Sequence, residues 1–197
     1  MLKKAQVVFA GVLAFLIATS TLADAASFER LPGYEAFALQ QVLNTWTPGQ
    51  RYSLGQLVNV SATLVLSGNL AYVALDDTNK KPAAKIVYSV APDGALTPVA
   101  TLPSGAQIKV PGRHVAALQA VFMFRNANPP PQTVNFLSQY GAQVVVSTQN
   151  NGKVYGIGFL ENPAAPPSGL VWIDAGTNEQ YHVTPSTFAV TRLHEFP

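Results

Sequence analysis

Histidine and carboxylate side chains are the residues of this sequence that could carry out acid–base chemistry or hold a metal ion. The three histidines, His114, His182 and His194, are far apart, and none follows H-x-x-x-H or H-x-H spacing. Metal sites formed within one helix or strand use such spacing. We therefore expect ordinary surface or boundary histidines, no metal site and no cofactor.

The carboxylates offer a second route to catalysis, because glycosidases use a pair of Asp or Glu residues. Asp76 and Asp77 are adjacent, so on a strand their side chains point to opposite faces. Glu161 and Asp174 are far from Asp76 and Asp77 in the sequence. No G-x-S-x-G or S-x-x-K motif marks a nucleophilic serine. A secreted hydrolase of wall or sugar polymers, using Asp or Glu with a histidine, is thus the alternative hypothesis. Because the ionisable residues are few and scattered along the sequence, we favour a protein that is not an enzyme.

Binding residues are easier to propose than catalytic ones. The polar loop Asp76–Ala83 and the proline-rich loop Glu161–Gly169 follow predicted strands, and the prolines reduce the entropy lost on binding. Strand aromatics bind sugars or peptides in some proteins, although they more often pack against neighbours. Gly156 and Gly158 mark a second, glycine-lined surface on the strand Lys153–Leu160. The candidate binding residues are Asp76, Asp77, Asn79, Glu161, Asn162, Tyr72, Tyr155 and Trp172.

Composition limits the possible partners. Charged residues make up 11% of the 197 residues, against roughly 25% in typical soluble proteins. The formal net charge of +2 indicates no basic field for a phosphate backbone, so we expect no nucleic acid partner. The absence of cysteine excludes disulfides, thiolate metal sites and thiol catalysis. The remaining class of partner is a protein or envelope component that binds through contact area and hydrogen bonds.

The N-terminal segment is typical of a secretory signal peptide. Two lysines in "MLKK" precede the uncharged apolar run "AQVVFAGVLAFLIA", and Ala23-Asp24-Ala25 fits the small-residue cleavage rule. The run is shorter than the ~20 residues of a spanning helix. We therefore expect removal of residues 1–25, a periplasmic or secreted location, no membrane span in the mature chain, and one β-rich domain at 26–197.

Two short helices are predicted in that domain. In Tyr34–Trp46, apolar residues recur at intervals of three and four, and Pro48 prevents continuation. Gln132–Tyr140 follows a proline and precedes a glycine, as helices do. The segment Arg113–Arg125 is ambiguous, because its alanines favour a helix while "AVFMF" favours a buried strand. We favour a strand for its second half.

The remaining segments alternate apolar and polar residues between turn signals, which predicts antiparallel hairpins. The predicted fold is α+β, mainly an antiparallel β-hairpin meander with two short helices. The stretches "ATLVLSGNLAYVAL" and "AQVVVSTQNNGKVYGIGFL" share one pattern, and an offset of 83 residues places Tyr72 on Tyr155. This similarity suggests two duplicated β-rich halves, 53–110 and 132–197, with chance resemblance between meanders as the alternative.

These observations favour an exported, non-catalytic binding or structural protein of the bacterial envelope or secreted fraction. It would act through contacts with a protein or an envelope component. The features behind this expectation are the N-terminal segment, the scattered ionisable residues and the two loops.

Overall fold

The computed structural model describes residues 28–46, 52–128, 143–149, 152–160 and 177–195. Within them the fold is α+β, with two antiparallel five-stranded sheets and three helices. The strands of sheet A, in spatial order, are β1 (Phe28–Pro32), β7 (Gln143–Gln149), β8 (Val154–Leu160), β9 (Thr177–Val183) and β10 (Val190–Glu195). Those of sheet B are β5 (Leu96–Val99), β4 (Ala84–Val90), β3 (Leu70–Asp77), β2 (Val60–Ser67) and β6 (Gln107–Val110).

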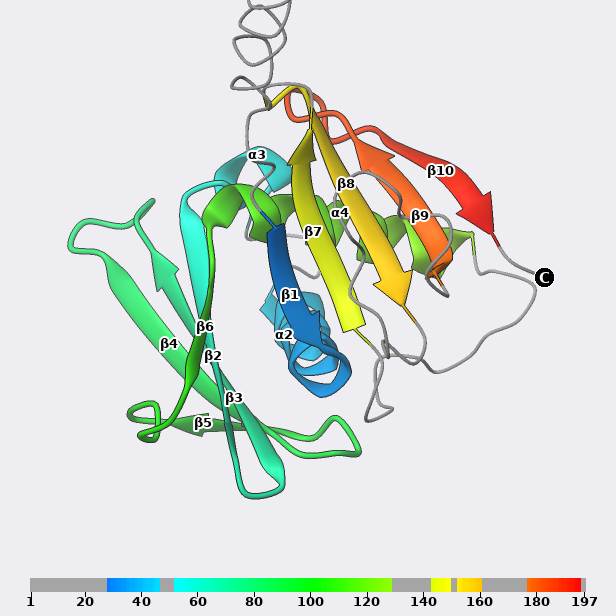
Figure 1. Ribbon diagram of the computed structural model, residues 1–197. Coiled ribbons are helices and arrows are strands. Elements are labelled where there is room, and N and C mark those ends of the chain that lie inside the picture. Colours follow the sequence, from blue (N-terminus) through cyan, green and yellow to red (C-terminus); the bar gives the residue numbers. More distant parts are fainter. Residues whose placement is uncertain (1–27, 47–51, 129–142, 150–151, 161–176, 196–197) are drawn as a thin grey trace, which may run out of the picture.

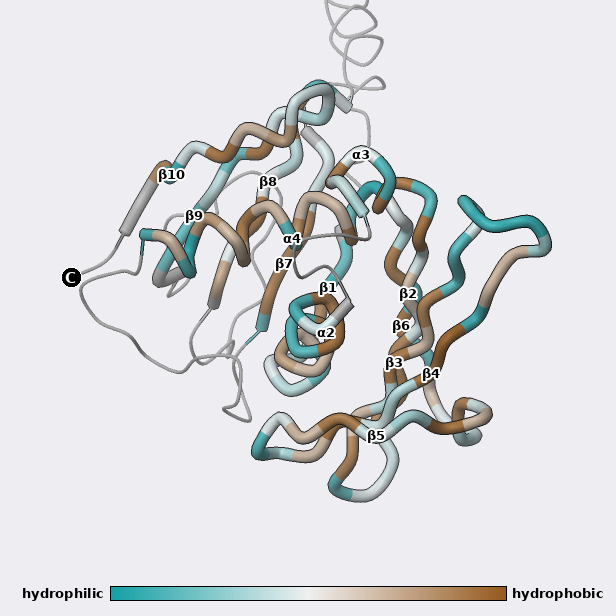
Figure 2. Tube along the Cα trace, turned by 180° about the vertical axis from the view of Figure 1, so that it is seen from behind, coloured by the Kyte–Doolittle hydropathy of each residue, from teal (hydrophilic) through white to brown (hydrophobic). Residues whose placement is uncertain are grey.

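Two long helices pack on the sheets: in Figure 1, α2 (Gly33–Trp46) lies between the sheets and α4 (Gly112–Ala127) crosses one face of sheet A. The helix α2 packs on β2, β3 and β4 of sheet B and touches β1 and β7 of sheet A. The helix α4 packs on β8, β9 and β10 of sheet A and on β2 of sheet B. Both sheets and both helices therefore share one hydrophobic core. Hydrophobic residues concentrate on the central strands of both sheets in Figure 2.

The helix predicted at Tyr34–Trp46 is confirmed and begins one residue earlier, at Gly33. Its apolar stripe is completely buried at Leu39, Val42 and Leu43. The Tyr34 hydroxyl donates to the backbone carbonyl oxygens of Asn69 and Val90, at 3.0 and 2.7 Å. These bonds fix the start of α2 to sheet B.

The strand predicted for the second half of Arg113–Arg125 is wrong, because α4 is helical throughout that segment. Every residue from His114 to Phe122 is buried. A helix that is buried on all sides has no one-sided apolar stripe. The sequence pattern could therefore not distinguish it from a buried strand.

The second predicted helix, Gln132–Tyr140, lies outside the described residues. A third helix, α3 (Leu54–Leu57), was not predicted. Its signal is a capping box in "SLGQ": the Ser53 side chain accepts from the Gln56 backbone N–H, and the Gln56 side chain accepts from the Ser53 N–H. No helix among the described residues is long and apolar enough to cross a membrane.

Each sheet combines a four-strand meander with one strand from elsewhere in the chain. Sheet B consists of β2 to β5 in sequence order, with β6 added beside β2. Sheet A consists of β7 to β10, with β1 added beside β7. Each added strand leads into one of the long helices, β1 into α2 and β6 into α4. The order strand, long helix, meander thus occurs twice along the chain.

Candidate functional site

The adjacent carboxylates Asp76 and Asp77 end β3 and have different environments, as the strand alternation predicts. Asp77 has no exposed surface. The side chain of Asp76 is 40% exposed, and its Oδ1 lies 4.0 Å from Lys85 Nζ. The two carboxylates therefore do not form a catalytic pair.

Asp77 anchors the base of the loop that follows β3. Its Oδ2 accepts from the Tyr52 hydroxyl at 2.5 Å. Its Oδ1 accepts from the Asn79 backbone N–H at 2.9 Å and from Asn79 Nδ2 at 3.0 Å. Burial alone would raise the pKa of Asp77, but these hydrogen bonds and the nearby Lys80 lower the pKa below its ordinary value.

Asn79 connects the same loop to the segment after α3. Its Nδ2 also donates to the Gln56 carbonyl oxygen, and its Oδ1 accepts from Asn59 Nδ2, both at 3.0 Å. The Thr78 hydroxyl donates to the Asn59 carbonyl oxygen at 2.8 Å. The candidates Asp77 and Asn79 are therefore brought together, and their polar groups hold the loop in place.

The other candidate binding residues do not gather into one site. Glu161, Asn162 and Trp172 lie outside the described residues. Tyr72 is half-buried on β3, on the face opposite the core residues Ala71 and Val73. Tyr155 belongs to the other sheet and is 5% exposed, within the core.

A group of lysines forms a surface that the sequence analysis missed. Lys80 and Lys81 lie in the loop between β3 and β4, Lys85 lies near the start of β4, and Lys109 lies on β6; all four are exposed. Lys85 pairs with Asp76 on β3, and Lys109 pairs with Thr63 on β2. Lys80, Lys81 and Lys85 therefore lie at the end of sheet B where β3 turns into β4, whereas Lys109 lies near the middle of the sheet on the edge strand β6, three strands away from β4. We call Lys80, Lys81 and Lys85 the lysine end.

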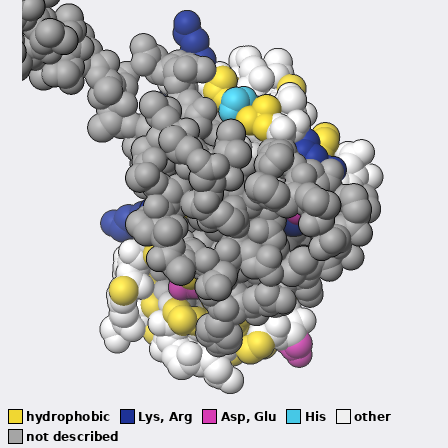
Figure 3. All heavy atoms as spheres, turned by 45° about the vertical axis from the view of Figure 1, so that its right-hand side comes forward, with side chains coloured by type: hydrophobic (Ala, Val, Ile, Leu, Met, Phe, Trp, Pro, Cys, Tyr) yellow, Lys and Arg dark blue, Asp and Glu magenta, His cyan; other side chains and the backbone are white. Residues whose placement is uncertain are grey.

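The loop of the lysine end extends away from the body of the molecule in Figure 1, and it is hydrophilic in Figure 2. The carboxylates Glu35, Asp77 and Glu179 are buried. Among the described acids, Asp93 is exposed and the Asp76 side chain is 40% exposed, whereas the exposed cations are Arg30, Lys80, Lys81, Lys85, Lys109, Arg113 and Lys153. The described surface is therefore basic, which the net charge does not reveal. Basic side chains project from the rim of the molecular face that Figure 3 shows.

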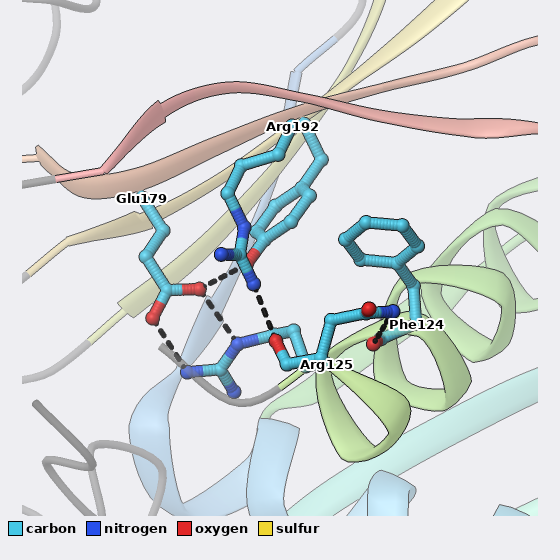
Figure 4. A network of polar contacts seen from close by, with 6 residues as sticks. Phe124, Arg125, Glu179 and Arg192 are labelled. Atoms are coloured by element: carbon cyan, nitrogen blue, oxygen red, sulfur yellow. Dashed lines mark hydrogen bonds and ion pairs between the residues drawn. The ribbon is translucent and has the colours of Figure 1, made fainter. Parts of the chain in front are cut away.

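A buried ion pair connects the end of α4 to sheet A (Figure 4). Arg125 Nε and Nη2 donate to the two carboxylate oxygens of Glu179 at 2.7 and 2.9 Å. The Tyr181 hydroxyl donates to the same carboxylate. The Arg125 guanidinium lies 4.3 Å from the centre of the Phe159 ring, where a cation–π contact adds to the attraction.

This network changes the acidity of its members. Burial alone would raise the pKa of Glu179, but hydrogen bonds from Arg125 and Tyr181 lower it below its ordinary value. Burial and the Glu179 carboxylate raise the pKa of Tyr181 to about 12. Arg192 Nη2 donates to the Asn128 carbonyl oxygen at 2.5 Å. The charged groups of Arg125, Glu179 and Arg192 thus connect α4 and its C-terminal end to β9 and β10.

His114 is not the surface or boundary residue that the sequence analysis expects, because it is 6% exposed. Its Nδ1 lies 2.8 Å from Glu29 Oε2, an ion-pair distance without hydrogen-bond geometry. Its Nε2 lies 3.2 Å from Thr148 Oγ1, and its ring packs edge-on against Tyr155. Carboxylate, imidazole and hydroxyl follow one another as in hydrolytic triads, but burial leaves a substrate little access to the imidazole.

No group of three or more His, Asp or Glu within the described ranges is placed to hold a metal ion. The chain matches no protein-family model, no curated protein and no solved structure. The arrangement of its own residues is therefore the basis for a functional proposal.

Two buried carboxyl groups are expected to affect stability in opposite directions. Burial raises the pKa of Glu35, so its contribution to stability is present at acidic pH and is lost as pH rises through the folded-state pKa. Asp77, with a lowered pKa, contributes above its unfolded-state pKa, and this contribution is lost as pH falls. We expect Glu35→Gln to raise the urea midpoint at pH 7, with a smaller gain at pH 4.

The variant Asp77→Ala should lower the free energy of unfolding at pH 7 by about 1–3 kcal/mol, because the Tyr52 hydroxyl and the Asn79 N–H lose their acceptor. A Glu35→Gln protein that is less stable than the native chain at pH 7 would show that the Glu35 carboxylate is stabilised rather than penalised.

Proposed function

We propose that this protein is exported after removal of residues 1–25 and acts as a non-catalytic binding protein in the periplasm or the secreted fraction. Its partner is a protein with an acidic surface, which docks on the lysine end. One observation supports this proposal above the others: three exposed lysines, Lys80, Lys81 and Lys85, lie in or next to a loop that the buried Asp77 holds in place.

The fixed base favours binding because an ordered loop loses little conformational entropy when a partner docks. Asp77 and Asn79 connect the loop to Tyr52, Gln56 and Asn59, on the segment that contains α3. Binding residues commonly lie on loops that a rigid scaffold positions. The polar groups of Asp77 and Asn79 are used inside the loop, so the lysines are the groups that remain for a partner.

The chemistry of the partner follows from the charge distribution. Glu35, Asp77 and Glu179 are buried and the exposed cations outnumber the exposed acids among the described residues, so an approaching molecule meets a basic surface. Complementary charge mainly increases association rate and specificity, and its effect decreases with added salt. An acidic protein surface fits these properties.

Catalysis has less support, since the ionisable groups of an active site converge in an accessible cleft. Asp77 is bound to Tyr52 and Asn79, Glu179 is bound to Arg125, and Glu29 lies against His114. Each of these contacts connects separate elements of the fold. We therefore assign these groups a structural role.

We also propose that the chain contains two copies of one unit, covering roughly 28–99 and 107–195. "PGYEAFALQQV" (32–42) and "PGRHVAALQAV" (111–121) agree at six of eleven positions, and both begin a long helix that follows an added strand. Tyr88-x-Val90-x-Pro92 and Tyr181-x-Val183-x-Pro185 end the third strand of each meander. This division differs from the halves 53–110 and 132–197 suggested by the hairpins alone.

The docking proposal is tested with two double variants of equal charge change in the chain 26–197. Lys80→Glu/Lys81→Glu alters the lysine end, and Arg30→Glu/Lys153→Glu alters exposed residues of sheet A and of its β7–β8 turn. We expect the first to bind immobilised poly-glutamate about tenfold more weakly than the native chain, equivalent to ~1.4 kcal/mol. The second double variant should lose much less affinity for poly-glutamate, although both double variants have the same net charge.

Two results would contradict the proposal. Equal loss of binding in both double variants would mean that net charge, and not the lysine end, determines binding. Release of product from ester or glycoside substrates that disappears in His114→Gln or Glu29→Gln would instead indicate the hydrolase. Circular dichroism of each variant would separate these outcomes from unfolding.

A further inference from the structure

The two added strands are exchanged between the proposed copies. The first strand of the first copy, β1, does not join its own meander but pairs with β7 of the second. The first strand of the second copy, β6, pairs with β2 of the first. The exchange is therefore reciprocal.

The two exchanges also have the same geometry. Both pairs are antiparallel, and the last residues of each added strand lie opposite the start of the meander's first strand: Leu31 opposite Val144, and Val110 opposite Ala62. Leu31 and Val110 each precede the Pro-Gly pair that leads into the helix, and both are buried. Equivalent residues thus make equivalent contacts in the two sheets.

Reciprocal exchange of identical elements is the arrangement of a strand-swapped homodimer. We propose that this chain is such a dimer fused into one polypeptide, and that the edge of β2 at Ala62–Val65 is a surface that accepts β6 from a second copy of the chain. This inference rests on the proposed duplication and is independent of the lysine end. The segment between β5 and β6 keeps β6 in its own molecule.

That segment, Ala100–Ala106, must connect opposite edges of sheet B. Four strand spacings separate these edges, roughly 19 Å in a flat sheet. A Cβ added at Gly105 would lie 3.1 Å from Val65 Cγ1, so the segment passes close to β2. Seven residues reach this far, whereas two residues span only about 11 Å between the strand ends.

The exchange is tested in the mature chain 26–197 by replacing Ala100–Ala106 with two glycines. We expect light scattering to give twice the monomer mass, with circular dichroism unchanged, because β6 can then reach only the β2 edge of a second molecule. The helix α4 and strands β7–β10 must follow β6 to that molecule, since Pro111 alone separates β6 from α4. A matched variant, with the segment doubled in length by glycine and serine, should remain monomeric. A folded monomer with the shortened segment would overturn the exchange. An unfolded product would overturn it as well, since pairing with a second chain restores every contact.

The equivalence of the two copies has its own test at Gly33, the counterpart of Gly112. A Cβ at Gly112 would lie 2.1 Å from the Val58 carbonyl oxygen, and Gly33 is buried at the equivalent start of α2. We expect Gly33→Ala to lower the urea midpoint as much as Gly112→Ala does. If Gly33→Ala leaves the midpoint unchanged while Gly112→Ala lowers it, the copies are not equivalent and the fused-dimer proposal is wrong. Poly-glutamate binding by the lysine end would be unaffected by that result.

Discussion

Gly112→Ala is expected to destabilise the protein by about 3 kcal/mol or more, at the upper end of the cost of overpacking. The added Cβ would lie 2.1 Å from the carbonyl oxygen of Val58 and 2.7 Å from its carbonyl carbon. Both are backbone atoms that follow α3, so they cannot rotate away as a side chain would. The start of α4 would have to move, and with it the contacts that α4 makes with both sheets.

Gly55→Ala is the matched control for this substitution. Gly55 lies in α3, and a Cβ there would meet only the Ser53 hydroxyl, at 3.9 Å. Alanine favours helix over glycine by about 1 kcal/mol, so this variant should be as stable as the native chain or slightly more stable. Urea denaturation followed by circular dichroism compares the two. Similar midpoints for both variants would mean that the close approach of α4 to Val58 does not exist in solution.

The sequence predicted the elements whose pattern is local. The helix at Tyr34–Trp46 has its apolar stripe on one face, and the hairpin turns occur at glycine and asparagine, so both could be recognised within a short window. The helix α4 could not, because burial on every side removes the periodic signal. The SLGQ capping box of α3 was readable, but that segment was assigned no helix.

The tyrosine match at an offset of 83 residues pairs positions on different faces of their sheets. Matching Tyr72 to Tyr155 places a residue on the outer face of sheet B against one in the core of sheet A. A shift of one residue exchanges the faces of a strand. An offset of 84 in place of 83 puts Val73 against Ile157 and Leu75 against Phe159, all of them core residues. A shared tyrosine was therefore a poorer guide than the buried positions.

The lysine end illustrates why non-local contacts limit sequence analysis of a site. Lys80, Lys81 and Lys85 are close in the chain, but the contacts that hold their loop come from Tyr52, Gln56 and Asn59 in a separate segment. No local pattern specifies those non-local contacts. Likewise, the carboxylates were counted without their burial, so the net charge gave no sign that the described surface is basic.

The second large effect is expected from breaking the buried ion pair. Arg125→Met leaves the Glu179 carboxylate buried, with Tyr181 as a remaining donor. Removing one member of such a pair typically costs about 3–5 kcal/mol, because the other charge stays away from water without compensation. The substitution should also raise the pKa of Glu179, which Arg125 holds low. Its stability loss should therefore be larger at pH 7 than at pH 4, where the carboxyl can take up a proton.

Replacing both partners distinguishes attraction from the cost of an isolated charge. Arg125→Met/Glu179→Gln removes both charges and keeps an amide oxygen that can accept from the buried Tyr181 hydroxyl, so we expect this double variant to be more stable than Arg125→Met alone. The exposed pair Lys85 and Asp76, 4.0 Å apart, serves as a control, and Lys85→Met should change the unfolding free energy by less than about 1 kcal/mol. If the double variant is as unstable as Arg125→Met, the pair contributes net attraction beyond compensating for its own burial. The connection between the end of α4 and β9 would then depend on these charges and not on the packing around them.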